Sequence, residues 1–517
     1  MFDQLFEGLW ATLGIAPIAA MLFGVAVGMV IGAVPGLTAT MGVALAIPFT
    51  YGMSPLTALA MLAGIHNGAS QGGALPAILL RIPGSTGSIA TCWDGYPMTQ
   101  KGQARAAIRL SAASSAVGGM ISAFSLMLLA PPLALFALKF GPPEVFWVNI
   151  FGLTAIVALI GDDPIKGVAS ACIGLLIGTV GIDGVTGFER FTFGTLELSN
   201  GIPELAIIVG MFSLPPTLAL ARRTTFGDAG PLGALDKVAK HVWSVAQVWK
   251  VWIRASLIGI VLGIIPGSSG GSVFIAYTEA RRVSKHPEEF GKGSPEGLAA
   301  AETVNNADNA AAMIPTLTLG IPGSSIAALM LGALLIHGLQ PGPALFRDNP
   351  EIVYGYSWQM VITSLLLIPF GGIIASRIFI QVLRVSPALL LPMIGAMMVA
   401  GVFAYQNMLY NVYLMLGFGA LALLMTRLNF PITPVIIGII LGLSAEFNLR
   451  LSLLLSGGSP TILFTRPVSI AIIGVILALI AYVAISRRRQ NRATAKAEAA
   501  AEADPSHPPP PPTAPAA

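Results

Sequence analysis

Long apolar runs dominate this chain, and they constrain its fold more than any other feature. The first clear run covers about residues 13–34, and the last covers 468–485. Only 10% of the 517 residues are charged, whereas a soluble domain typically carries about 25%. So few charges cannot cover a water-facing surface, and lipid must therefore solvate much of the chain. At roughly 20 apolar residues per crossing, there is room for about ten to twelve transmembrane helices.

The runs indicate helices and not the strands of a membrane barrel, because barrel strands alternate in polarity and are only about ten residues long. Further apolar stretches lie at about 107–135, 145–160, 167–181, 202–220, 251–265, 326–336, 360–380, 387–402, 409–425 and 435–443. The 58 glycines and 38 prolines are compatible with this reading, since membrane helices tolerate both. We predict an all-α polytopic membrane protein.

Two polar segments interrupt the apolar pattern. Residues 222–250 form a basic connection, and residues 487–517 begin with a cluster of arginines and end in a run of prolines. The positive-inside rule places both in the cytoplasm, and the composition of the tail predicts disorder. We therefore expect a first membrane half (1–220), a basic cytoplasmic connection (221–250), a second membrane half (251–486) and a disordered cytoplasmic tail (487–517).

Sequence signatures of several chemistries are missing. Cys92 and Cys172 form no CxxC pair, the five histidines form no HExxH, and no GxxxxGK[ST] phosphate loop occurs. A disulfide between the cysteines stays open beside the reading that both are small buried side chains. The basic pI near 9.1 is what cytoplasmic loops contribute in any membrane protein. We expect no enzyme activity, no resident cofactor and no nucleic-acid partner.

The two halves of the chain match in two blocks. GMVIGAVPG, which starts at Gly28, corresponds to GIVLGIIPG, which starts at Gly259, at an offset of 231 positions. HNGASQGGALPAILLRIPGS, which starts at His66, corresponds to NNADNAAAMIPTLTLGIPGS, which starts at Asn305, at an offset of 239. Two blocks in the same order and at nearly the same offset indicate an internal repeat.

Each block has a physical interpretation. Glycines at every fourth position line one helix face and let another backbone approach closely. A Pro-Gly pair then ends the helix, because proline lacks a donor and glycine admits unusual dihedral angles. The freed backbone groups must be buried in protein or line a polar cavity. The alternative is that these pairs are only kinks or loop turns at the membrane surface.

Corresponding loops of the two halves exchange their basic residues. Loop 51–56 contains no lysine or arginine, whereas its counterpart 278–297 contains four. The connection after the first IPGS contains Lys101, Arg105 and Arg109, whereas its counterpart 337–350 contains only Arg347. The positive-inside rule then places corresponding loops on opposite sides of the membrane. We predict two inverted-topology repeats, whose broken, Pro-Gly-interrupted helices meet at the membrane midplane.

These motifs resemble the large membrane subunit of the tripartite tricarboxylate transporters. The resemblance covers about residues 32–103 and 263–343, through GAVPGLTATMGVALAIPFTYGMSP, IPGSTGSIATCWDGYPMTQKGQA, GIIPGSSGG, FGKGSPEGLAAAETVNNA and LTLGIPGS. It implies a multi-pass permease of the bacterial inner membrane. It also implies two partners, a small membrane subunit and a periplasmic solute-binding protein, and uptake of citrate-like or other carboxylates driven by an ion gradient.

Some residues depart from the family pattern and bear on the substrate and the ion. His66 and Asn67 stand where aromatic or small residues are usual, Arg81 where a neutral polar residue is usual, and Asp308 and Asn309 where small residues are usual. Two rival functions stay open. One is a membrane-embedded enzyme built on His66, His337 and Asp308, and the other is an uncoupled channel or scaffold.

The expected substrate site follows from what a carboxylate needs when it leaves water, namely donors and positive potential. Helix N-termini that restart after the four Pro-Gly pairs, nearby hydroxyls and the guanidinium of Arg81 supply both. The predicted substrate-binding residues are Pro35, Gly36, Thr38, Thr40, Arg81, Pro83, Gly84, Ser85, Thr86, Pro266, Gly267, Ser268, Ser269, Pro322, Gly323, Ser324 and Ser325. Alternatively, the serines are simple N-caps, and Arg81 extends to a lipid headgroup.

The expected coupling ion is sodium or a proton. Sodium is bound by oxygens of unwound backbone and of neutral or acidic side chains. The predicted coupling-ion residues are Asn67, Ser70, Asn306, Asp308 and Asn309. Alternatively, the asparagines and the serine only hydrogen-bond neighbouring helices, and Asp308 lies at the membrane interface. An ionisable group at membrane depth is costly and usually functional.

Overall fold

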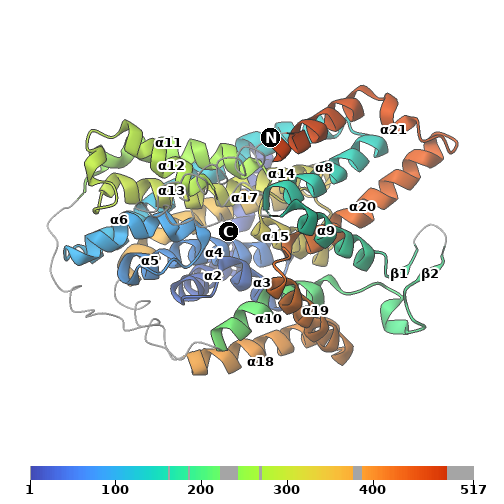
Figure 1. Cartoon of the computed structure of the whole chain (residues 1–517), viewed down its shortest axis with the longest axis horizontal. Helices are drawn as coiled ribbons and strands as arrows, with labels where there is room; N and C mark the ends of the chain where they lie inside the picture. The colour runs from blue at the N-terminus through green and yellow to red at the C-terminus, as the bar shows by residue number, and fades with distance from the viewer. Residues whose placement is uncertain are drawn as a thin grey trace, which may run out of the picture. The chain divides into compact units, whose positions relative to one another are not determined.

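The computed structural model describes residues 2–160, 163–183, 187–221, 243–266, 271–375, 387–481 and 483–485, and these are almost entirely helical (Figure 1). The strands β1 (Gly181–Ile182) and β2 (Glu189–Arg190) form a two-residue antiparallel ladder. Within the described residues, nine helices are long and apolar enough to cross a membrane, and four shorter apolar helices accompany them. The prediction of an all-α polytopic membrane protein is confirmed.

The first half contains α1 (Phe2–Thr12), α2 (Ile15–Ala33), α3 (Ala39–Thr50), α4 (Pro55–Gly72), α5 (Ala74–Leu80), η1 (Thr86–Ser88), α6 (Ile89–Gln100), α7 (Ala104–Ala137), α8 (Pro142–Ile160), α9 (Pro164–Gly178), η2 (Leu196–Leu198) and α10 (Glu204–Ala221). The basic connection falls mostly at 222–242, outside the described residues, and the predicted tail 487–517 lies wholly outside them.

The second half contains α11 (Val245–Ile264), α12 (Ser272–Val283), η4 (Pro287–Glu289), α13 (Pro295–Ala311), α14 (Met313–Leu319), α15 (Ser325–Ile336), α16 (Pro343–Asp348), α17 (Pro350–Leu367), the π-helix η5 (Ile368–Ile374), α18 (Pro387–Gln406), α19 (Leu409–Arg427), α20 (Thr433–Leu455) and α21 (Ile462–Thr465). A further apolar helix covers Pro467–Ile485.

The helices form two compact units, and each unit contains segments from both predicted halves. One unit comprises Met1–Lys139 and Thr179–Ile432, and the other comprises Phe140–Gly178 and Thr433–Ala517. In the first unit α10 packs against α18 and α19, and in the second α20 packs against α8 and α9. A helix of each half therefore packs against a consecutive helix pair of the other half. The boundaries of the four sequence segments stay a prediction.

The glycine-rich faces pack as their spacing predicts. A Cβ atom at Gly28 of α2 would lie 2.5 Å from the carbonyl oxygen of Ile65 in α4. A Cβ atom at Gly68 of α4 would lie 2.5 Å from the carbonyl oxygen of Val25 in α2. Contacts this short are incompatible with a side chain, so the two backbones touch directly and hold α2 rigidly against α4. The matching pair in the second half, α11 and α13, also packs closely.

Corresponding positions of the two repeats adopt the same backbone conformation. Val34, after α2, has φ −81° and ψ 114°, and Ile265, after α11, has φ −83° and ψ 115°. Arg81 ends α5 in the left-handed conformation, and Gly320 ends α14 in the same way. The predicted helix breaks are therefore present in both repeats. Glycine adopts this conformation readily, whereas it is uncommon for arginine.

Candidate functional site

The helix breaks within one repeat lie next to each other. A Cβ atom at Gly84 would lie 2.8 Å from the Cα atom of Gly73 and 3.3 Å from the carbonyl oxygen of Gly32. In the second repeat, a Cβ atom at Gly323 would lie 2.8 Å from the carbonyl oxygen of Gly263. The end of the first helix of each repeat therefore meets the IPGS segment that follows the second break.

Three of the five predicted coupling-ion residues come together across the two repeats. Nδ2 of Asn309 in α13 donates to Oδ1 of Asn67 (3.0 Å) and to Oγ of Ser70 (3.2 Å), both in α4. Ser70 and Asn309 are 239 positions apart, which is the offset of the repeat, so they are equivalent residues in contact. Such a contact is expected only near a symmetry axis that relates the repeats. We call Asn67, Ser70 and Asn309 the asparagine cluster.

Helix α17 adds two hydroxyls that sequence reasoning missed. Nδ2 of Asn67 donates to Oγ1 of Thr363 (2.8 Å) and to Oγ of Ser364 (3.2 Å). Both hydroxyls are buried, and the π-helix η5 follows a turn later. The available signal was a pair of adjacent hydroxyls inside an apolar run, together with Pro369, which interrupts that run. π-Helical turns of this kind are frequent at functional sites.

The other two coupling-ion candidates lie elsewhere on α13. Nδ2 of Asn306 donates to the carbonyl oxygen of Glu302 in its own helix (3.3 Å). Asp308 is 7% exposed, and its Oδ1 would lie 2.8 Å from a Cβ atom at Gly263. Asp308 therefore faces the end of α11, beside the second Pro-Gly break, and is not part of the asparagine cluster.

A buried carboxylate that was not predicted lies two turns before Asn309. Both oxygens of Glu302 accept hydrogen bonds, Oε1 from Thr91 Oγ1 and Oε2 from Ser111 Oγ (3.0 Å) and Ser115 Oγ (3.1 Å). These four residues have no exposed surface. The signal in the sequence was a single acidic residue in an alanine-rich segment. From the sequence alone, we interpret this residue as the end of the preceding polar loop. At the equivalent position the first repeat has Ala63.

Asp94 of α6 is a second buried carboxylate that was not predicted, and its role is to hold a loop. Its Oδ1 accepts three backbone N–H groups, from Gly291 (2.9 Å), Gly293 (2.8 Å) and Ser294 (2.8 Å). Its Oδ2 accepts the hydroxyl of Tyr277 (2.7 Å). Because Ser294 is the N-cap of α13, Asp94 of the first repeat fixes the start of the helix that carries Glu302 and Asn309.

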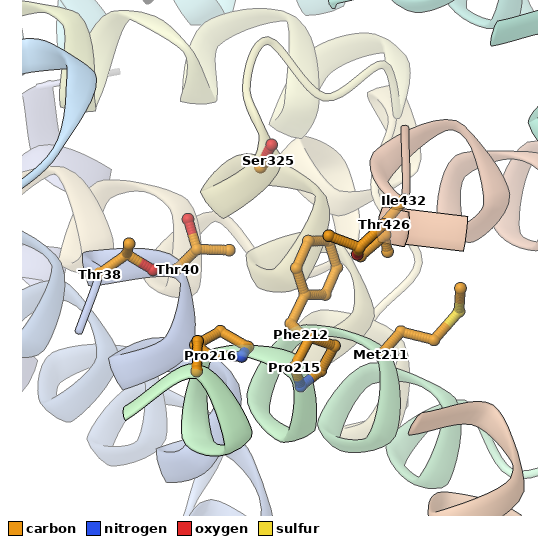
Figure 2. Close-up of a pocket in the computed structure, with 10 residues that line it drawn as sticks. Thr38, Thr40, Met211, Phe212, Pro215, Pro216, Ser325, Thr426 and Ile432 are labelled. Carbon is orange, nitrogen blue, oxygen red and sulfur yellow. The ribbon is translucent and has the colours of Figure 1, made fainter. Parts of the chain in front are cut away.

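Three predicted substrate-binding residues line one cavity of about 390 Å³. Thr38 and Thr40 come from the start of α3 in the first repeat, and Ser325 comes from the start of α15 in the second (Figure 2). The remaining lining residues come mainly from α10: Met211, Phe212, Pro215, Pro216 and Ala219, with Thr426 and Ile432. The lining residues include no charged side chain, so hydroxyls and helix N-termini are its polar features.

Two of the predicted hydroxyls cap helices. Oγ1 of Thr38 accepts the N–H of Met41 (3.2 Å), and Oγ of Ser324 accepts the N–H of Ala327 (3.1 Å). Capping uses an oxygen lone pair, so each hydroxyl hydrogen stays available as a donor. The hydroxyl of Ser85 instead pairs with that of Ser88 (3.2 Å).

Arg81 does not line the cavity. It is exposed, and within the described residues it forms no ion pair. Both interpretations of Arg81, substrate binding and contact with a headgroup, therefore stay open. The other predicted substrate-binding residues form or flank the breaks, namely Pro35, Gly36, Pro83, Gly84, Thr86, Pro266, Pro322 and Gly323. Gly267, Ser268 and Ser269 lie outside the described residues.

Two residues of the enzyme alternative, His337 and Asp308, have different surroundings. His337 pairs with the hydroxyl of Thr50 (3.2 Å), whereas Asp308 lies beside Gly263. In the part of the chain that the structure describes, no group of three His, Cys, Asp or Glu side chains could hold a metal ion. Both cysteines are free, with Cys92 buried and Cys172 exposed.

Comparison with known proteins adds an independent line of argument. Residues 18–437 match the family described as "Tripartite tricarboxylate transporter TctA family". A protein of Agrobacterium vitis, described as an uncharacterized 52.8 kDa protein in the TAR-I ttuC' 3'region, is 34% identical over 480 residues, covering 91% of this chain and 93% of that protein. A second, described as an uncharacterized protein in the TAR-II ttuC' 3'region, also from Agrobacterium vitis, is 33% identical over 234 residues, covering 43% of this chain and 94% of that protein. No solved structure matches the chain.

Proposed function

Because this chain belongs to the tripartite tricarboxylate transporter TctA family, we propose that it is the large permease subunit of a secondary transporter that takes up tricarboxylates or related carboxylates. An ion gradient drives the uptake, and a periplasmic solute-binding protein delivers the substrate. The observation that carries the proposal is the cavity lined by Thr38 and Thr40 of one repeat and Ser325 of the other.

The chemistry of this cavity suits a carboxylate. Helices α3 and α15 both begin at it, at Ala39 and Ser325. The first turns of a helix present free N–H groups and the positive end of the helix dipole, which together bind anions. The hydroxyls of Thr38, Thr40 and Ser325 add donors that replace part of the water shell. The volume of about 390 Å³ lies in the range of roughly 300–1,000 Å³ that small-molecule sites occupy.

The asparagine cluster supplies the oxygens that a monovalent cation needs. Side-chain oxygens of Asn67, Ser70 and Asn309, with the hydroxyls of Thr363 and Ser364, meet where α4 and α13 end. Broken helices of transporters bind sodium in such places. Asp308 lies beside the second Pro-Gly break, outside the asparagine cluster, and is a separate acidic candidate for the ion path. Sodium and protons both stay open as the coupling ion.

The repeat has inverted topology in this proposal. The matching backbone at the breaks and the contact between the equivalent residues Ser70 and Asn309 support a two-fold axis. The exchange of basic residues between corresponding loops supports an axis in the membrane plane. The chain then lies in the bacterial inner membrane with its C-terminal tail in the cytoplasm, and a small membrane subunit completes the transporter.

Cysteine labelling tests the inverted topology. In a chain with Cys172→Ser, which removes the exposed thiol, we expect Ser54→Cys and Lys285→Cys to react from opposite sides of the membrane. Both positions are exposed and precede the equivalent helices α4 and α13. An impermeant maleimide should label Ser54→Cys in intact cells and Lys285→Cys only after permeabilisation. Labelling of both cysteines in intact cells would rule out the inversion.

The function itself is tested by uptake of labelled citrate into vesicles that contain the complete transporter. Uptake should depend on an imposed sodium or proton gradient and on the solute-binding protein encoded beside this chain. That binding protein should purify with a carboxylate ligand. A binding protein that purifies with a sugar and has no affinity for carboxylates would contradict the proposed substrate.

A further inference from the structure

We propose that Glu302 takes up and releases a proton during the transport cycle, and that the hydroxyls of Thr91, Ser111 and Ser115 form a site that accommodates both its protonated and its ionised state. This inference rests on the proposed function, because it assigns one chemical step to a coupled transporter. It concerns residues outside the cavity and outside the asparagine cluster.

The hydroxyls around Glu302 suit a group that changes its protonation state. A hydroxyl can rotate, so it donates to a carboxylate and accepts from a carboxylic acid, whereas an amide N–H can only donate. Oγ of Ser111 accepts a hydrogen bond from Nε2 of Gln71 (2.9 Å), which directs the hydroxyl hydrogen of Ser111 toward Glu302. Asp94 differs in this respect, because three of its donors are backbone N–H groups, which stabilise only the carboxylate.

In the described residues, no cation forms an ion pair with Glu302. The helices and turn that pack on α13 are α4, α6, α7, α11, α12, α14 and η1. Their titratable or charged groups are His66 on α4, Cys92, Asp94 and Tyr96 on α6, Arg105 and Arg109 on α7, Lys250 and Arg254 on α11, and Tyr277, Glu279, Arg281 and Arg282 on α12. Of these, Asp94 holds the loop before α13. Arg109, Lys250, Arg254, Arg281 and Arg282 are exposed.

A buried carboxylate without a cation is costly in its ionised state. Binding of a positive ion relieves that cost, and a proton fits the site better than sodium does. The hydroxyls touch the carboxylate oxygens directly, at 3.0 Å and 3.1 Å for Ser111 and Ser115, which leaves no ion-sized space between them. Glu302 also lies within the continuous helix α13, whereas transporters bind sodium with carbonyls of unwound backbone.

The position of Glu302 links it to the rest of the site. Gln71, which donates a hydrogen bond to Ser111 beside Glu302, follows Ser70 of the asparagine cluster directly in α4. Glu302 and Asn309 are seven residues apart on α13, and that spacing places them on one helix face. A movement of α13 against α4 during transport would therefore change the hydrogen bonds of both clusters together.

Infrared difference spectroscopy of the purified full-length chain in lipid nanodiscs tests the inference without any substrate. The spectrum is recorded as the pH is changed across about 5 to 9, and the C=O stretching band of carboxylic acids is followed. We expect a band that appears on acidification, is lost in Glu302→Gln and is kept in Glu289→Gln. Glu289 is the control, because it is exposed in the loop before α13.

Two further measurements keep the result interpretable. Ser115→Ala retains the carboxyl group but removes one donor to it, so the midpoint of the band should move to higher pH. If Glu302→Gln does not fold, the shift of the band midpoint in Ser115→Ala tests the inference by itself. Identical titrations of wild type, Glu302→Gln and Ser115→Ala would overturn the inference. Loss of the wild-type band when sodium chloride replaces choline chloride at constant pH would overturn it too, because sodium would then occupy the site.

Failure here is distinguishable from failure of the proposed function. If Glu302 does not titrate but ion-driven uptake of a carboxylate persists, only the role of Glu302 is wrong. If Glu302 titrates but no uptake occurs with the complete transporter, the proposed function is wrong.

Discussion

Asn309→Ala lowers the apparent affinity of uptake for the coupling cation by about tenfold to a hundredfold, since an orphaned buried polar group costs roughly 1–3 kcal/mol. The side chain of Asn309 donates to both Asn67 and Ser70. Alanine removes one proposed cation ligand and the two hydrogen bonds that hold Asn67 and Ser70 in position. The measurement is the initial rate of carboxylate uptake as a function of sodium concentration, and separately of proton concentration, at saturating substrate.

Asn448→Ala is the matched control for this variant. The amide of Asn448 bonds to the carbonyl oxygen of Ser444 in its own helix, α20 (2.8 Å), so the substitution should leave the cation dependence unchanged. Equal expression and equal thermal stability of the two variants separate a binding defect from a folding defect. Normal cation dependence in Asn309→Ala would remove the asparagine cluster from the ion site.

We expect Thr40→Phe to abolish most of the uptake without unfolding the chain. Thr40 lines the cavity of about 390 Å³ (Figure 2), so a phenyl ring can occupy that space and exclude the substrate. Thr40→Val separates the two roles of the side chain, because valine keeps the shape and removes the hydroxyl. We expect Thr40→Val to weaken apparent substrate affinity by up to about tenfold, the effect of one lost hydrogen bond.

The kinetic constants of both variants are measured in vesicles with the complete transporter. Size-exclusion profiles in detergent establish that each variant is folded. If Thr40→Phe transported as wild type does, the cavity would lie outside the substrate path. If only Thr40→Val transported normally, the cavity would remain the site, and binding would rest on the helix N-termini and the other hydroxyls.

The sequence was sufficient to predict the helix breaks, because proline and glycine act locally. Val34 and Ile265 adopt nearly the same dihedral angles, as two copies of one Pro-Gly motif should. The close approach of another backbone to the glycine-lined face of α2 also followed from the spacing of its glycines. These features depend on residues within one or two turns of each other, which a single sequence displays.

Which polar side chains meet could not be predicted, since that depends on helix rotation and on partners far along the chain. Asn309 and Asp308 are adjacent in sequence, yet consecutive residues of a helix point about 100° apart. One therefore faces α4, and the other faces the end of α11. Glu302 was missed for the same reason, because its three hydroxyl partners come from other helices, Thr91 from α6 and Ser111 and Ser115 from α7. The packing of α10 against α18 and α19 likewise leaves no local signal.

Accumulation of substrate against its own gradient tests the central claim most directly. Vesicles that contain the complete transporter are loaded with an ion gradient and given labelled citrate, and the internal and external concentrations of unmodified citrate are compared at steady state. A coupled permease raises the internal concentration above the external one, and an ionophore that collapses the gradient abolishes the difference. Equal concentrations on both sides despite an intact gradient would indicate an uncoupled channel. Chemical conversion of the labelled citrate would indicate an enzyme. Either result would contradict the proposed coupled transport.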